Sequence, residues 1–381
     1  MVDPTEQDVS ERKAEEASIE RLRGVYEVSS ARKRLLLIIT AVLLAAAVVV
    51  SVSIGAVNIP LSDTLKVFGH AVAPSLIAGP DNAWYSDIIL NARLSRTVLC
   101  ILCGFSLAIA GAVMQNVLRN PLVSPFTLGV SSAASFGASM AIVFGGGITG
   151  SILFLGHEFF VKNLLIAFLA FLAGLGSISL VILLSKRRDI SRSTIILTGV
   201  IISYFFQAGV TAAKYFSDDS ALREITLWLM GGMWNATWGV DFLLIPIVVV
   251  CVMVIESKAV DVNVLSAGDE VATSLGINVA RLRSSLLLIS TLVTSVCIAF
   301  TGIIGFIGLI APHLTRMLIG NDNRYLFPAS GLMGAFILLV SDIVARMVIR
   351  PSELPVGVIM YIVGGIFFIW MVTRRKKEVA M

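Results

Sequence analysis

Long apolar runs dominate this sequence and constrain its fold more than any other feature. Several of them reach the roughly 20 residues that an α-helix needs to cross a lipid bilayer. Only 14% of the 381 residues are charged and 57% are hydrophobic, whereas a water-soluble domain carries about 25% charged residues. The chain cannot cover itself with a water-compatible surface. We therefore expect an all-α, polytopic integral membrane protein with about ten transmembrane helices in a lipid bilayer.

The apolar runs divide into ten predicted spans. They cover about residues 35–54, 96–115, 130–146, 163–184, 194–216, a sixth that ends near 255, two within 284–319 that separate near Gly302, 328–349, and a tenth that ends at 373. Small residues in span 130–146 predict close packing inside the bundle. Segment 61–72 predicts an amphipathic helix along the membrane surface. Residues 35–373 thus form one membrane domain, with a polar tail at 1–34 and a basic tail at 374–381.

The distribution of positive charge predicts the orientation. In the favoured topology, seventeen lysines and arginines adjoin the spans on the cytoplasmic side and eight lie outside, as the positive-inside rule requires. Both termini are then cytoplasmic. Where the positive charges lie matters more than the net charge of +4. We therefore do not read that charge as a nucleic-acid binding surface, and we predict no nucleic-acid partner. The exceptions are Arg93 and Arg96 at one outer helix start, and Arg346 and Arg350 at one outer helix end.

Motifs for catalysis are missing from the sequence. It contains no G-x-x-x-x-G-K-[ST], G-x-S-x-G or H-E-x-x-H. Cys100 and Cys103 form a C-x-x-C, but inside an apolar run, so we interpret them as small buried residues and not as a redox or metal site. The three histidines are scattered. We therefore predict no catalytic residue, no metal site and no cofactor bound by this chain.

A polar island at 265–283, LSAGDEVATSLGINVARLR, interrupts the apolar pattern. Ser266 is a predicted N-cap for a short helix, with Asp269 and Glu270 in the first turn. Gly276 would end that helix. The pattern favours a docking surface, and the alternative is a surface helix between two spans.

One acidic residue lies deep in a predicted span. Asp342 precedes Arg346 by four residues, which places both on one helix face and predicts a structural ion pair. The alternative role for such a residue is ion coupling in a secondary carrier.

Seven ordered strings resemble one known family. They are RLSRT, GAVMQNVLRNPLVSPFTLGVSS, WLMGG, LSAGDEVATSLGI, GFIGLIAPHLTR, DIVAR and ELPVGV, within about residues 35–373. The chain thereby resembles the FecCD family, permease subunits of binding-protein-dependent ABC importers for iron-siderophores, haem and cobalamin. The resemblance implies ten helices per subunit and two permease subunits, identical or homologous, around one pathway. It also implies an extracytoplasmic substrate-binding protein and an ABC ATPase dimer that uses ATP and Mg.

The resemblance also implies roles for particular residues. The loop at 256–283 would couple to the ATPase through Gly268, Asp269, Glu270, Leu275, Gly276 and Ile277. Docking of the binding protein would use Arg93, Arg96 and Arg346, for which pairing with headgroups or aspartates is the alternative. The cytoplasmic gate would include Asn120, Leu122, Arg192 and Ser193, although Arg192 departs from the small polar residues expected there. The fifth and tenth spans would line the pathway.

The predicted function is the permease subunit of an ATP-driven importer in the cytoplasmic membrane of a prokaryote. Its cargo would be a ferric siderophore or a similar metal chelate, and cobalamin or haem is the alternative cargo. Two alternatives of other classes are an ion-coupled secondary carrier and a receptor that transports nothing.

Overall fold

The computed structural model describes residues 30–378, apart from 56, 58, 77, 81, 155 and 187–191. Most of the predicted tail at 1–34, and the last three residues of the tail at 374–381, lie outside the described residues. Within the described part, seven helices are long and apolar enough to cross a membrane, and three shorter helices are also apolar. These ten match the predicted spans one to one, which confirms the all-α membrane fold.

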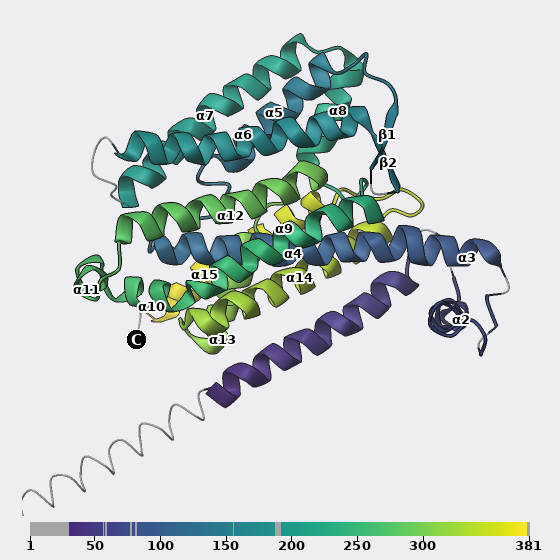
Figure 1. Cartoon of the computed structure of the whole chain (residues 1–381), viewed down its shortest axis with the longest axis horizontal. Helices are drawn as coiled ribbons and strands as arrows, with labels where there is room; N and C mark the ends of the chain where they lie inside the picture. The colour runs from purple at the N-terminus through teal and green to yellow at the C-terminus, as the bar shows by residue number, and fades with distance from the viewer. Residues whose placement is uncertain are drawn as a thin grey trace, which may run out of the picture.

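The helices form a bundle in which most of them run along one common direction (Figure 1). After a first helix at Ser30–Ser53, the elements are α2 (Leu61–Val72), α3 (Ala83–Asp87), a π-helical stretch (Ile88–Leu94), α4 (Ser95–Val117), α5 (Val130–Phe144), β1 (Ser151–Phe154), β2 (His157–Phe160), α6 (Val161–Lys186), α7 (Arg192–Phe216), α8 (Asp219–Met230), α9 (Trp238–Ser257), α10 (Ala259–Ala267), α11 (Asp269–Ser274), α12 (Val279–Thr301), α13 (Ile307–Ile319), α14 (Asn323–Met347) and α15 (Val356–Glu378).

Helix α4 is the centre of the bundle. Helices α9, α12, α13 and α14 all pack against it, and 78% of the most apolar stretch of the continuous helical run Ala83–Val117 is buried. This run begins earlier than the predicted start near Arg96. The side chain of Asn82 caps the additional turn by accepting a hydrogen bond from the Trp84 N–H at 3.1 Å. The second predicted span is therefore extended at its start by α3 and the π-helical stretch.

Glycines on α4 allow its neighbours to approach closely. A Cβ atom added to Gly111 would lie 2.0 Å from the carbonyl oxygen of Gly308 on α13, and one added to Gly104 would lie 2.6 Å from that of Gly334 on α14. Because apolar side chains gain little by leaving lipid, van der Waals packing at such contacts contributes most of the association between membrane helices.

We expect Gly111→Ala to lower the melting temperature of the purified protein. The added methyl group forces α4 and α13 apart, and overpacking of this kind costs about 1–3 kcal/mol. Gly176→Ala on α6 is the matched control, because no neighbouring atom lies within 4 Å of the position of its Cβ. Equal melting temperatures for the two variants would contradict this account of the α4–α13 contact.

A second layer, formed by α5, α6 and α7, covers one side of α12 (Figure 1). Ten of the 15 residues of α5 are buried, which confirms the predicted packing of its small residues. The connection from α5 to α6 forms an antiparallel hairpin of β1 and β2, and α8 follows α7. The sequence analysis predicted neither the hairpin nor α8. The break near Gly302 is confirmed, since α12 ends at Thr301 and α13 begins at Ile307.

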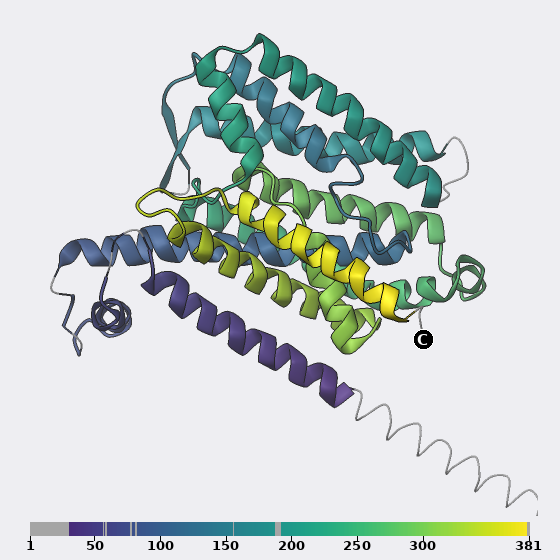
Figure 2. The same cartoon turned by 180° about the vertical axis from the view of Figure 1, so that it is seen from behind.

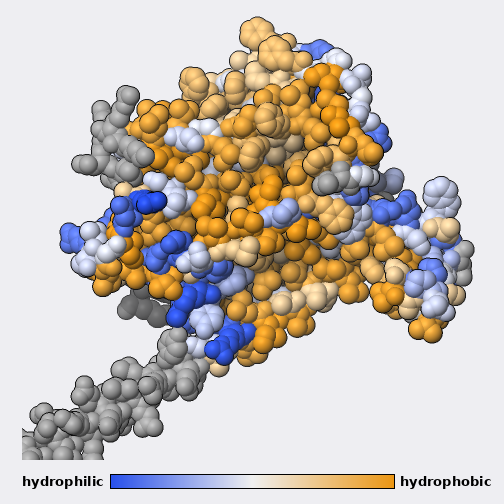
Figure 3. Space-filling view, viewed as in Figure 1, coloured by the Kyte–Doolittle hydropathy of each residue, from blue (hydrophilic) through white to orange (hydrophobic). Residues whose placement is uncertain are grey.

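The sides of the bundle expose a wide apolar surface, and polar residues gather toward its two ends (Figure 3). Helix α7 has only 17% of its most apolar stretch buried, and the Ser30–Ser53 helix has 22%. On the face seen in Figure 2, α15 crosses the bundle and packs against α13 and α14. Such faces fit contact with lipid or with a second membrane-spanning chain.

Candidate functional site

The polar island folds into two short helices, α10 and α11. Ser266 is not the predicted N-cap, because it lies in the last turn of α10 and its hydroxyl donates to the carbonyl oxygen of Val262 at 2.9 Å. Gly268 separates the helices with φ 150°, a backbone conformation that residues with side chains rarely adopt. As predicted, Asp269 and Glu270 occupy the first turn of α11.

Glycine also ends α11. Gly276 has φ 84°, and its N–H donates to the carbonyl oxygen of Thr273 at 3.0 Å, while that of Ile277 donates to the oxygen of Ala272 at 3.0 Å. This pattern resembles the glycine-terminated helix ends common in proteins. Helix α11 is thus a short helix bounded by two glycines, between α10 and α12.

Three arginines from three separate segments converge on Asp269. Arg192 Nη2 lies 2.8 Å from Asp269 Oδ1, and Arg119 Nη2 lies 3.5 Å from the same oxygen. Arg283 Nη2 lies 3.0 Å from Oδ2. Arg119 also donates to the carbonyl oxygen of Leu265. We call Asp269, Arg119, Arg192 and Arg283 the Asp269 cluster.

The charges of the Asp269 cluster keep its carboxylate ionised. Burial raises the pKa of Asp269, but the hydrogen bond and charge of Arg283, followed by those of Arg192, outweigh it and hold the pKa below its usual range. The Asp269 side chain is 39% exposed, whereas that of Arg283 is 4% exposed. The cluster therefore joins a buried guanidinium group to a partly exposed carboxylate at the end of the bundle.

The structure brings some of the predicted coupling and gate residues together. Arg192, from the predicted gate, binds Asp269 of the predicted coupling loop, and Arg119 directly precedes the gate candidate Asn120. The Asn120 side chain accepts a hydrogen bond from the Leu122 N–H at 2.9 Å.

The remaining predicted residues at this end do not join the cluster. Leu122 and Ser193 are exposed, as are Glu270 and Leu275 on α11. Ile277 is partly buried and packs against an apolar cluster of the bundle. One side of α11 therefore faces the bundle, where Asp269 binds the three arginines. The opposite side, which we call the outer side, is exposed.

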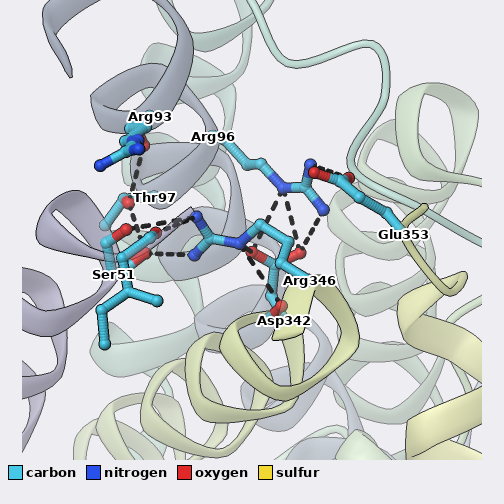
Figure 4. Close-up of polar contacts among 8 residues, drawn as sticks. Ser51, Arg93, Arg96, Thr97, Asp342, Arg346 and Glu353 are labelled. Carbon is cyan, nitrogen blue, oxygen red and sulfur yellow. Dashed lines mark hydrogen bonds and ion pairs between the residues drawn. The ribbon is translucent and has the colours of Figure 1, made fainter. Parts of the chain in front are cut away.

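A second charged group lies at the other end of α4 (Figure 4). Arg96 donates to Asp342 through Nη2 at 2.8 Å and through Nε at 3.1 Å, and its Nη1 donates to Glu353 at 2.6 Å. Arg346 Nε lies 3.0 Å from Asp342 Oδ2, which confirms the predicted pair four residues apart. We call Arg96, Asp342, Arg346 and Glu353 the Arg96 cluster. Arg96 stands in the first turn of α4 and Arg119 follows its last turn, so the two clusters mark opposite ends of the bundle.

Two arginines at this end of the bundle, Arg93 and Arg346, hold the end of the first helix. Arg93 Nη1 donates to the carbonyl oxygens of Val52 and Ser53 at 2.9 and 2.8 Å, and Arg346 Nη1 donates to those of Ser51 and Ile54 at 3.2 and 3.1 Å. Cations at a helix C-terminus satisfy its last carbonyl groups and complement the helix dipole.

This geometry bears on the predicted docking arginines. Arg93 is 5% exposed and Arg346 is 4% exposed, so both guanidinium groups are engaged within the chain, and Arg96 is paired with two carboxylates. Arg96 and Arg346 both pair with Asp342, which is the alternative of aspartate pairing given above. Docking on this end of the bundle stays a prediction.

Sequence reasoning missed three residues of these clusters. Arg119 and Glu353 lie in strings that carry the family resemblance, and Arg283 lies in the polar island, but the sequence gives none of the three a role of its own. A charged residue immediately beside an apolar run was the available signal in each case. Cys100 and Cys103 are both buried, as predicted for small residues within an apolar helix.

Comparisons with known proteins agree on one family. The model of the FecCD transport family matches residues 42–374. The chain is 41% identical over 295 residues to an ABC transporter permease protein of Methanocaldococcus jannaschii, covering 77% of this chain and 83% of that one. It is 34% identical over 298 residues to the hemin transport system permease protein HmuU of Yersinia pestis, covering 78% and 86%.

Two further relatives extend this picture. The vitamin B12 import system permease protein BtuC of Vibrio cholerae is 34% identical over 313 residues, covering 81% of this chain and 90% of that one. A solved ABC transporter of the metal-chelate type, in an inward-facing conformation, superposes with a TM-score of 0.75 at 29% identity, covering 90% and 99%.

Proposed function

The chain belongs to the FecCD transport family, and from this we propose that it is the permease subunit of an ATP-driven ABC importer for a ferric siderophore or a similar metal chelate. The observation that carries this proposal is the family match, which covers the second half of the first helix and all nine apolar helices that follow it. The likeness to a solved transporter of the metal-chelate type supports the cargo class. Haem or cobalamin is the alternative cargo, which the relatives from Yersinia pestis and Vibrio cholerae favour.

In this proposal the Asp269 end faces the cytoplasm of a prokaryote, and both termini lie on that side of the cytoplasmic membrane. An ABC ATPase dimer binds there and uses ATP and Mg, while this chain binds no cofactor and catalyses no reaction. Supporting this division, α11 projects between two glycines and exposes Glu270 and Leu275. A short helix of this kind suits a cleft on another protein.

A second permease subunit, identical or homologous, completes the pathway. Helix α7 supports this because it exposes large side chains along its length, including Tyr204, Phe205 and Tyr215. Helix α15 exposes Tyr361 and Ile366 in the same way. These two helices are the predicted fifth and tenth spans, and we propose that they line the pathway.

The extracytoplasmic binding protein docks at the Arg96 end in this proposal. Of the three predicted docking arginines, Arg96 retains the largest exposed side-chain fraction, at 14%, and Arg93 and Arg346 support it by fixing the end of the first helix. At the Asp269 end, Asn120, Leu122, Arg192 and Ser193 contribute to the gate. Transport follows alternating access, in which closure of the ATPase pair moves α11 and opens one end of the pathway as the other closes.

Uptake into vesicles tests the proposed function. We expect vesicles that contain the purified complex to accumulate a labelled ferric siderophore only when ATP and the loaded binding protein are both supplied, because hydrolysis provides the free energy. Labelled cobalamin and haem form the parallel arms of the experiment. Accumulation driven by a proton or sodium gradient without ATP would contradict the proposal, and uptake of cobalamin or haem alone would change the cargo.

A further inference from the structure

The Asp269 cluster joins helices α7 and α11, whose main packing partners differ. Helix α7 packs against α5, α6 and α8, whereas α11 packs against α10 and α12. Arg192 is the first residue of α7, and its guanidinium group binds the Asp269 carboxylate of α11 at 2.8 Å. Arg119 links the same carboxylate to the connection between α4 and α5.

Both oxygens of the Asp269 carboxylate are occupied within the chain. Oδ1 faces Arg192 and Arg119, and Oδ2 faces Arg283. The three guanidinium groups around this one carboxylate give the cluster a net positive charge, which disfavours the approach of a cation on another protein. The exposed side chains of this segment that remain available to a partner are Glu270, Val271, Thr273 and Ser274 of α11 and Leu275 directly after it. Asp269 therefore points to a task inside the chain.

Little apart from these ion pairs fixes α11 in place. Ala272 is the one residue buried within this six-residue helix, and Gly268 and Gly276 flank it with positive φ angles. The geometry lets α11 move as a unit about two hinges, since glycine adopts a wide range of backbone conformations. A displacement of α11 then acts on α7 through the Asp269–Arg192 pair.

The charges around Asp269 do not balance within the cluster. Three guanidinium groups share one carboxylate, and the pKa of Arg119 is lowered by burial and next by the charge of Arg192. Without the carboxylate, the arginines of the α4–α5 connection, α7 and α12 would repel one another. Asp269 thus determines whether these three segments attract or repel.

We propose that Asp269 is a positioning residue that transmits the movement of α11 to α7 and to the α4–α5 connection, and does not itself contact the ATPase. This role rests on the proposed importer function. In that machine, α11 receives the motion of the ATPase through its outer side chains, and Asp269 passes it through Arg192 to the helix that lines the pathway. Loss of the carboxylate uncouples ATP hydrolysis from transport.

The test compares Asp269→Asn and Arg192→Gln with the control Glu224→Gln in reconstituted vesicles. Glu224 lies on α8, outside the predicted coupling loop and both charged clusters, and pairs with Lys162 at 2.6 Å, so its replacement leaves the Asp269 cluster intact. We expect each cluster variant to lower the number of cargo molecules transported per ATP by about tenfold, the size of a typical coupling between sites. The control should match the unaltered chain.

The double variant Asp269→Asn/Arg192→Gln provides the sharper measurement. If both residues act through one pair, its transport-to-hydrolysis ratio should fall no further than that of either single variant. A ratio equal to that of the unaltered chain in either single variant would overturn the proposal. The proposal would also be overturned if the ratio of the double variant fell by the product of the two single-variant factors, because the two residues would then act independently.

A second readout needs no cargo. Spin labels attached through Ser193→Cys and Ser274→Cys would report the distance between α7 and α11, since both positions are exposed and the native cysteines are buried. We expect Asp269→Asn to broaden this distance distribution, and an unchanged distribution would overturn the role of Asp269. If the unaltered chain lacks ATP-driven uptake, the importer proposal fails instead, whatever the labels show.

Discussion

Asp342→Ala should destabilise the protein by about 3–5 kcal/mol, because it leaves two buried guanidinium groups without their shared carboxylate. Asp342 is fully buried and binds both Arg96 and Arg346. Replacement with alanine also leaves a cavity where the carboxylate was. The expected result is a large fall in the melting temperature of the purified complex, together with a low yield of folded protein in the membrane.

The partner at the edge of the same cluster provides the control. Glu353 binds Arg96 at 2.6 Å, but its side chain is 25% exposed, so water can replace it in part. We expect Glu353→Gln to cost less than about 1 kcal/mol. Should Asp342→Ala fold with an unchanged melting temperature and lose only transport, the structural role would be refuted and an ion-coupling role for Asp342 would regain support.

The Arg96 cluster shows which parts of a site a sequence can predict. The pair between Asp342 and Arg346 follows from helix geometry, because residues four apart share one face. The pair between Arg96 and Asp342 joins α4 to α14, and only the folded bundle places them together. Local spacing therefore predicts the first pair, whereas for Arg96 the sequence leaves docking of a binding protein and pairing with an aspartate as alternatives.

The same contrast applies to the fold. Ten spans could be predicted because each requires a long apolar run, and the break at Gly302 is visible as glycines within one. Helix α8 and the β1–β2 hairpin were missed, since neither contains the long apolar run that marks a span, whereas the amphipathic pattern at 61–72 predicted α2 correctly. Ser266 was predicted as a cap from its residue type, whereas the backbone at Gly268 places the boundary two residues later.

The Asp269 cluster could not be predicted for a related reason. Its arginines lie 150, 77 and 14 residues from Asp269 in the sequence, and local rules on charge spacing cover only three or four residues. The resemblance to the family placed Asp269 and Arg192 in separate roles, one in coupling and one in the gate. Their direct contact at 2.8 Å is the finding that connects the two roles.

The outer side of α11 carries the second prediction of large effect. Leu275 is 66% exposed and Val271 is 44% exposed, and they lie four residues apart at the charged end of the bundle. Two exposed apolar side chains on one face of a short helix are typical of an anchor for a protein partner. Asp269 faces the bundle instead, so in the proposed importer we expect these two side chains to contact the ATPase.

Leu275→Asp should therefore weaken binding of the ATPase by roughly 30-fold or more, which corresponds to about 2 kcal/mol for an interface anchor. Titration of the purified ATPase against the permease in lipid nanodiscs would measure this affinity. Ser274→Asp is the matched control, because it adds the same charge to an exposed polar position of the same helix, and it should change the affinity less than about threefold. Equal losses in both variants would indicate a general effect of negative charge on α11. A loss confined to Leu275→Asp would identify the apolar face as the contact, because the partner must then desolvate that side chain to bind.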